Sequence, residues 1–143
     1  MMPVFPLSRN RNWRRWLIVL PILILVAACS SDNTQPPAAA ANLPPGDAAR
    51  GAELFTQSAN GAPPCSTCHT LDGSTVVGPS MQGYGARAGS RVSGKSAEDY
   101  TLESITQPAS FLAPGFPNVM YTNYAAAFTP QDMADLMAYL LSR

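Results

Sequence analysis

Five consecutive residues, Cys65-Ser66-Thr67-Cys68-His69, constrain this chain more than any other stretch of its 143 residues. Two cysteines three positions apart, followed directly by a histidine, form the attachment pattern of a c-type haem. This spacing lets the two thiols bond the two vinyl groups on one edge of the porphyrin, and it turns the adjacent imidazole toward the iron. We therefore expect one covalently bound haem c, attached through Cys65 and Cys68, with its iron bound by His69.

The Cys-x-x-Cys pair admits two other interpretations. A structural zinc site takes about four ligands, and the whole chain has only three Cys and one His, so every one of them would be needed. A thioredoxin-like dithiol remains open, although it would leave His69 without a role. That kind of site also belongs with a βαβ pattern, which the sequence does not show.

The N-terminal segment has the features of a secretion signal. Residues 1–15 contain four arginines, and residues 16–28 form an apolar run with a single proline in it. A membrane-spanning helix needs about 20 apolar residues, so this shorter run predicts a signal peptide over residues 1–28. Its Val-Ala-Ala-Cys ending resembles a bacterial lipobox, which implies that Cys29 is lipidated and becomes the new N-terminus. An ordinary signal peptide with a free Cys29, or an uncleaved anchor, are the alternatives.

The charge of the chain depends on this cleavage. Nine basic and nine acidic residues balance in the full chain, but the four basic residues before Cys29 leave with the signal, so five basic residues then face nine acidic ones. A mature charge of about −4 argues against a nucleic-acid partner. We expect a lipid-anchored protein on the periplasmic or extracytoplasmic side of the cell membrane.

Composition divides the remainder into a tether and a domain. Residues 29–45 are rich in Pro, Ala and small polar residues and show no apolar periodicity, which predicts a flexible tether with a reach of at most roughly 50 Å at about 3.1 Å per residue. The domain is expected over residues 46–143. The glycine-rich segment 83–90 is predicted to be a loop, because it lacks the context of a phosphate-binding motif.

Three helices are predicted in this domain, and each follows a residue suited to capping it. Apolar residues recur at helical spacing after each cap, whereas no stretch alternates with the two-residue period of a strand. The expected helices are a segment after Asp47 that ends before Asn60, a segment starting near Ser96 and ending before Pro108, and a segment from Pro130 through Leu140 after Thr129. This pattern indicates an all-α domain with a thin core, to which a haem adds an apolar centre.

The segment from Gly46 to Arg143 resembles a class I cytochrome c. Gly51-Ala52-Glu53-Leu54-Phe55 and Leu136-Met137-Ala138-Tyr139-Leu140 are similar to the first and last helices of that family. The resemblance implies that these helices cross at close range, with Gly51 at the crossing and Phe55 near Leu136 and Tyr139. It also implies the small all-α class I cytochrome c fold around one haem.

The same resemblance assigns further site residues. A Gly-Pro pair follows the haem motif in the family, which implies that the carbonyl of Pro79 accepts a hydrogen bond from the His69 ring. The sixth iron ligand is a methionine of the loop before the last helix, which implies Met120. Met81 is the competing candidate, and it suits the position where the family usually has Leu; Tyr121 stands where the family often has Pro after its methionine.

These features favour an electron-transfer protein without enzymatic activity, because His and Met ligands would occupy both axial positions of the iron. The lipobox, the tether and residues Tyr100, Ser104, Ile105 and Pro108 resemble the monohaem cytochrome c subunit of alternative complex III. This implies single-electron transfer in a respiratory or photosynthetic chain, from other subunits of a quinol-oxidising complex to a terminal oxidase or a small soluble carrier. A peroxidase-type enzyme or a haem-based gas sensor, each with an open sixth position, is the alternative.

Overall fold

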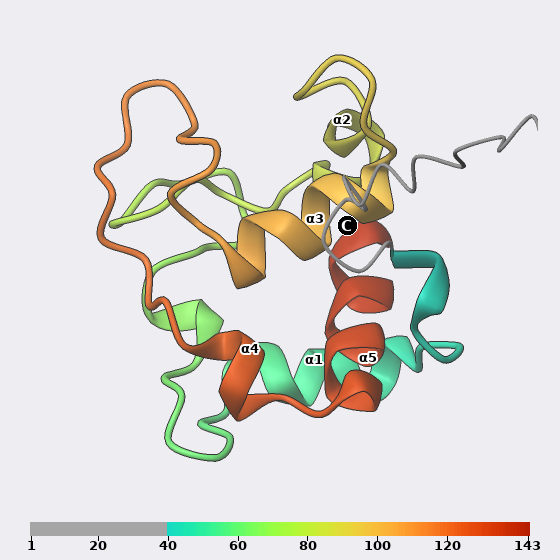
Figure 1. Cartoon of the computed structure of the whole chain (residues 1–143). Coiled ribbons are helices and arrows are strands. Elements are labelled where there is room, and N and C mark those ends of the chain that lie inside the picture. Colours follow the sequence, from blue (N-terminus) through green and yellow to red (C-terminus); the bar gives the residue numbers. More distant parts are fainter. Residues whose placement is uncertain (1–39) are drawn as a thin grey trace, which may run out of the picture. The chain divides into compact units, whose positions relative to one another are not determined.

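The computed structural model describes residues 40–143, so the predicted signal peptide, the predicted lipidation site at Cys29 and most of the predicted tether lie outside the described residues. The described part is built from helices, namely η2 (Ala40–Asn42), α1 (Ala48–Thr56), η3 (Cys65–Thr67), α2 (Tyr84–Ala88), α3 (Ala97–Thr106), α4 (Tyr124–Ala127) and α5 (Pro130–Leu141). Between residues 40 and 143 the only β contact is an isolated bridge joining Ala59 and Ala62. The all-α prediction is confirmed (Figure 1). Over the same range, no helix has the length and apolar content needed to cross a membrane.

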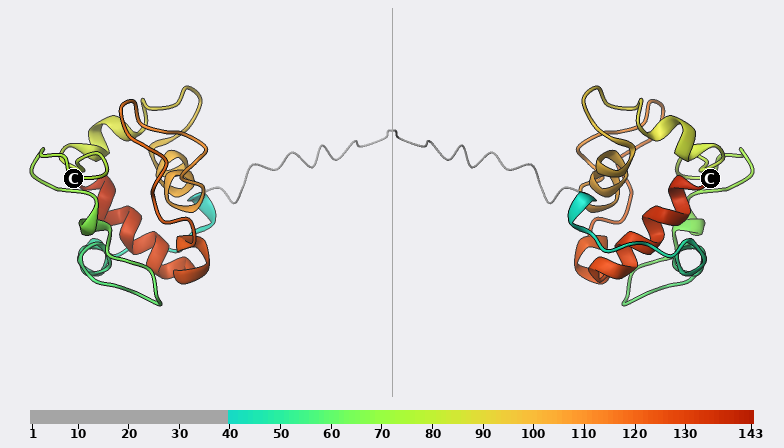
Figure 2. Two further views of the ribbon diagram at one scale, coloured as in Figure 1. Left: turned by 90° about the vertical axis from the view of Figure 1, so that its left-hand side faces the viewer. Right: turned by 90° about the vertical axis from the view of Figure 1, so that its right-hand side faces the viewer.

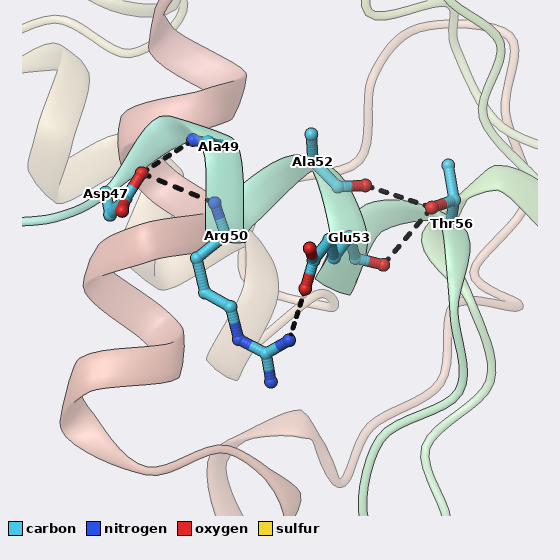
Figure 3. Close-up of polar contacts among 6 residues, drawn as sticks. All are labelled: Asp47, Ala49, Arg50, Ala52, Glu53 and Thr56. Carbon is cyan, nitrogen blue, oxygen red and sulfur yellow. Dashed lines mark hydrogen bonds and ion pairs between the residues drawn. The ribbon is translucent and has the colours of Figure 1, made fainter.

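The predicted caps start the three main helices. In α1 the carboxylate of Asp47 accepts hydrogen bonds from the backbone N–H groups of Ala49 and Arg50 (Figure 3). The Ser96 side chain caps α3 in the same way. Ahead of α5, the side chain of Thr129 accepts from the backbone of the third helical residue, whose carboxylate accepts in return. Such a capping box satisfies N–H groups that a helix start otherwise leaves without partners.

Helices α1 and α5 cross each other, and their buried side chains form part of the hydrophobic core (Figure 1). A Cβ atom on Gly51 would lie 2.0 Å from the carbonyl oxygen of Asp135 and 2.7 Å from Cβ of Tyr139, so only a glycine permits this approach. The rings of Phe55 and Tyr139 pack with their centroids 5.6 Å apart. The buried carboxylate of Asp135 joins the helices further by accepting from the backbone N–H of Asp47 at 2.7 Å. The close crossing implied by the resemblance is therefore present.

Helix α2 corrects the prediction of a loop over residues 83–90. Its first residue, Tyr84, is buried, and the Tyr84 hydroxyl pairs with the hydroxyl of Thr101 on α3 at 2.9 Å. Gly85 donates its N–H to the carbonyl of Arg143 beyond α5 at 2.9 Å. Contacts with α3 and with the end of the chain therefore stabilise α2, although the glycines of this segment disfavour a helix locally. Helix α4, which was not predicted, is likewise anchored by the buried Tyr124.

The packed region begins ahead of the domain boundary expected at Gly46. The N–H of Ala40 donates to the carboxylate of Asp99 on α3 at 3.0 Å. Ala40 and Leu43 pack against the core cluster. The last residues of the segment predicted as tether are therefore part of the folded unit.

Candidate functional site

A cavity of about 420 Å³ lies among η3, α3, α4, α5 and the loops that precede α2 and α4. Its walls include four of the residues singled out from the haem motif and its Gly-Pro pair, and both candidate methionines. These are Cys65, Cys68, His69, Pro79, Met81 and Met120. Residues up to 55 positions apart in the sequence, from Cys65 to Met120, thus meet around one cavity.

The two cysteines and the histidine are brought to one wall by η3. The carbonyl of Cys65 accepts from the backbone N–H of Cys68 at 3.1 Å and from that of His69 at 3.0 Å, which closes the chain into one tight turn. Both thiols are unpaired and partly buried. Burial raises the pKa of the Cys65 thiol to about 11, so this thiol is protonated at neutral pH.

The His69 ring has a defined tautomer. Its Nδ1 lies 2.8 Å from the carbonyl oxygen of Pro79. A carbonyl only accepts, so Nδ1 carries the proton and the lone pair of Nε2 is free for a metal. Burial lowers the pKa of His69, and the smaller effect of the Pro79 hydrogen bond raises it. The neutral imidazole is the form that binds iron.

The loop that carries Pro79 is itself held in place. The backbone N–H of Gly78 donates to the carbonyl of Cys68 at 2.9 Å, next to His69. On the other side of Pro79, the guanidinium of Arg87 donates to the carbonyls of Ser80 and Gln82. These contacts set the direction of the Pro79 carbonyl and, through it, the orientation of the His69 ring.

Gly78 leaves just enough room for this ring. A Cβ atom there would lie 2.5 Å from Cε1 and 2.8 Å from Nδ1 of His69. The glycine of the Gly-Pro pair is therefore in contact with the imidazole, whereas sequence reasoning had assigned a role only to Pro79.

The methionines fall into two groups. Met133 and Met137 are buried in α5 and do not line the cavity. Met81 reaches the cavity from the Pro79 loop, where its N–H donates to the carbonyl of Thr70 at 2.8 Å, directly beside His69 in the chain. Met120 reaches it from the separate loop between α3 and α4.

Sequence reasoning missed most of the apolar wall. Aromatic side chains of the α3–α4 loop and of α4 contribute to it, among them Phe111, Phe116 and Tyr124. The Tyr124 hydroxyl donates to the carbonyl of Pro63 at 2.9 Å, and burial raises the pKa of Tyr124. One feature of the sequence could have indicated this apolar wall, namely that no charged residue occurs from Ser104 to Gln131.

The donor set and the lining fit a haem c. The cavity is lined by two thiols, by the His69 imidazole, whose Nδ1 is already hydrogen bonded, and by the thioethers of Met81 and Met120. No Asp, Glu, Lys or Arg lines it. Within residues 40–143 no group of three His, Cys, Asp or Glu side chains is placed to hold a metal ion, so nothing in this part of the chain favours the zinc interpretation. The tyrosines, Phe and Pro of the wall offer the apolar contacts that a porphyrin requires.

Comparison with protein families gives one match, to the family model described as Cytochrome c, over residues 48–143. That range begins at the first residue of α1 and includes every residue that lines the cavity. The comparison with curated proteins gave no match to this chain.

Proposed function

Because the chain belongs to the cytochrome c family, we propose that it is a membrane-tethered monohaem carrier of single electrons. Haem c bound in the cavity supplies a one-electron couple, whose potential is tuned by its axial ligands, hydrogen bonds and burial. The observation that carries the proposal is the hydrogen bond between His69 Nδ1 and the Pro79 carbonyl, in the same uncharged cavity as the two thiols.

Each site residue has a role in this proposal. Cys65 and Cys68 form the two thioether links to the haem. His69 presents Nε2 to the iron, and Pro79 holds the ring and raises its basicity. Met120 would supply the sixth ligand, because it enters the cavity from a different loop than His69 does, whereas Met81 belongs to the Pro79 loop, which is hydrogen bonded to Thr70 next to His69.

Carbon monoxide binding tests the sixth ligand. The reduced, haem-loaded full chain should give a low-spin c-type spectrum that carbon monoxide leaves unchanged. Met120→Ala should bind carbon monoxide, and Met81→Ala, the matched control from the same cavity, should not. If the unmodified chain bound carbon monoxide readily, the sixth position would be open and an enzyme or gas sensor would explain the protein better.

The membrane attachment rests on the N-terminal sequence. Its lipobox supports a lipid on Cys29, which would anchor the chain and leave the haem domain on the periplasmic side. Expression in a bacterium with a labelled fatty acid should label the wild-type chain and leave Cys29→Ser unlabelled, and only the wild type should remain in carbonate-washed membranes. Label on both chains, or on neither, would refute the lipid anchor.

We further propose that the carrier is a subunit of a quinol-oxidising complex similar to alternative complex III and delivers electrons to a terminal oxidase or a small soluble carrier. Its support is the resemblance at Tyr100, Ser104, Ile105 and Pro108, all of which line the cavity. Purification of a tagged full chain in mild detergent should recover quinol-dependent reduction of its haem. A chain that is purified alone, while its membranes keep that activity, would contradict subunit status.

A further inference from the structure

Five large apolar side chains are exposed among residues 40–143, and they are confined to two loops. They are Leu71, Val76, Val77, Leu112 and Val119, with exposed fractions from 38% to 63%. Three of them, Val77, Leu112 and Val119, also line the cavity. The two loops lie on the same side of the domain, at the left of Figure 1 and toward the viewer in the left view of Figure 2. Scattered exposed apolar residues are ordinary, but their concentration around one opening marks an interaction surface. We call these five residues the mouth surface.

The mouth surface is also almost free of charge. No residue that lines the cavity carries a formal charge at neutral pH. One acidic residue lies within the two loops, Asp72, and its carboxylate accepts from the N–H and hydroxyl of Ser74. The guanidinium of Arg87 on α2 contacts the first of these loops through the carbonyls of Ser80 and Gln82. The ion pair of Arg50 with Glu53 lies on α1, outside both loops (Figure 3).

We propose that the redox partner docks on the mouth surface through apolar contact and without charge pairing, and that it is a protein with a similarly uncharged, apolar patch around its own redox centre. This inference rests on the proposed electron-carrier function, since electrons must pass close to the cavity opening. A charged patch on the partner would lose its hydration against this surface and gain no countercharge, which is unfavourable. A partner whose docking surface is also uncharged therefore binds here more favourably than a charged one.

The charge of the domain argues against other occupants. Residues 40–143 contain eight acidic and five basic side chains, a balance that repels anionic lipid headgroups. A second copy on this surface would cover both openings and block electron exchange. Docking without charge steering also has a kinetic signature, because charge-steered association falls steeply with ionic strength.

Protein-film voltammetry on coated gold electrodes tests the inference. The probes are alkanethiol monolayers that end in methyl, carboxylate or ammonium groups. The sample is the haem-loaded full chain in phosphatidylcholine nanodiscs, so that all variants share the same lipid. We expect the methyl surface to support the fastest electron exchange. That rate should change less than about twofold when the ionic strength rises from about 0.01 M to about 0.15 M, which shortens the Debye length from about 30 Å to about 8 Å.

Matched variants locate the contact. Val76→Glu and Leu71→Glu, at two mouth-surface residues that do not line the cavity, should each slow exchange on the methyl surface by about tenfold, equivalent to about 1.4 kcal/mol. Ala49→Glu adds the same charge to the exposed first turn of α1 and should leave the rate unchanged. Reduction by a small uncharged dye should be equal in all four proteins, which shows that each retains a working haem.

Each other outcome overturns a distinct idea. Faster exchange on a charged surface, or an unaffected rate in both Glu variants, would refute apolar docking while the carrier function stands. Loss of the methyl-surface signal on adding phosphatidylcholine vesicles would show that the mouth surface binds lipid, and dimers in sedimentation velocity would show that it binds a second copy. A haem that the dye cannot reduce and reoxidise would refute the proposed function itself.

Discussion

Replacing Gly78 with alanine should disturb the His69 ring and raise the reduction potential. The added Cβ would lie 2.5 Å from Cε1 of His69, whereas ordinary van der Waals contact begins at 3.4 Å, so the ring must move by about 0.9 Å. The ring has little freedom to move, because its Nδ1 is held 2.8 Å from the Pro79 carbonyl. Crowding of this kind costs about 1–3 kcal/mol.

The shift in potential follows from the hydrogen bond that this movement weakens. A hydrogen bond of this kind contributes about 1 kcal/mol, and it increases the electron donation of the imidazole, which favours the oxidised iron. Its loss should therefore raise the potential by roughly 40 mV, since 59 mV corresponds to about 1.4 kcal/mol for one electron.

A redox titration and a urea unfolding curve of the haem-loaded protein measure the two effects of Gly78→Ala. Gly89→Ala is the matched control, because its Cβ would meet nothing closer than 3.6 Å and its φ is −69°. Gly89→Ala should leave the potential unchanged and the stability equal or slightly higher. If Gly78→Ala behaved like this control, the Pro79 hydrogen bond would not tune His69, and our account of the site would be wrong.

Three further predictions concern the scaffold. Gly51→Ala places a Cβ 2.0 Å from a backbone oxygen of α5 and should lower the free energy of unfolding by about 2 kcal/mol, even after the roughly 1 kcal/mol gained in helix propensity; an unchanged urea midpoint would refute the close crossing. Thr129→Ala removes a capping box and should cost about 1 kcal/mol in the same assay, whereas a stable variant would show that the cap is dispensable. Burial raises the pKa of Tyr84 to about 12, so its neutral form contributes stability below pH 10 that is lost as the pH rises from about 10 to about 12. Tyr84→Phe should flatten that part of the pH–stability curve, and an equally steep loss in the variant would contradict this origin.

The sequence by itself determined the features that depend on neighbouring residues. The haem motif at residues 65–69, the caps at Asp47, Ser96 and Thr129 and the helical apolar spacing are local patterns, because capping hydrogen bonds and side-chain periodicity act within a few residues. These patterns were sufficient for an all-α domain with haem c, which the fold and the family match confirm. The pairing of His69 with Pro79 followed from a family resemblance and is present in the structure.

Only the tertiary structure decided what depends on contacts between distant segments. Helix α2 forms because Tyr84 is buried against Thr101 and Gly85 bonds the chain end beyond α5, neither of which local propensity predicts. The steric role of Gly78 against the His69 ring depends on a turn that sequence spacing does not describe. In the same way, the gathering of exposed apolar side chains around one uncharged opening requires the fold, because two loops far apart in the sequence form it together.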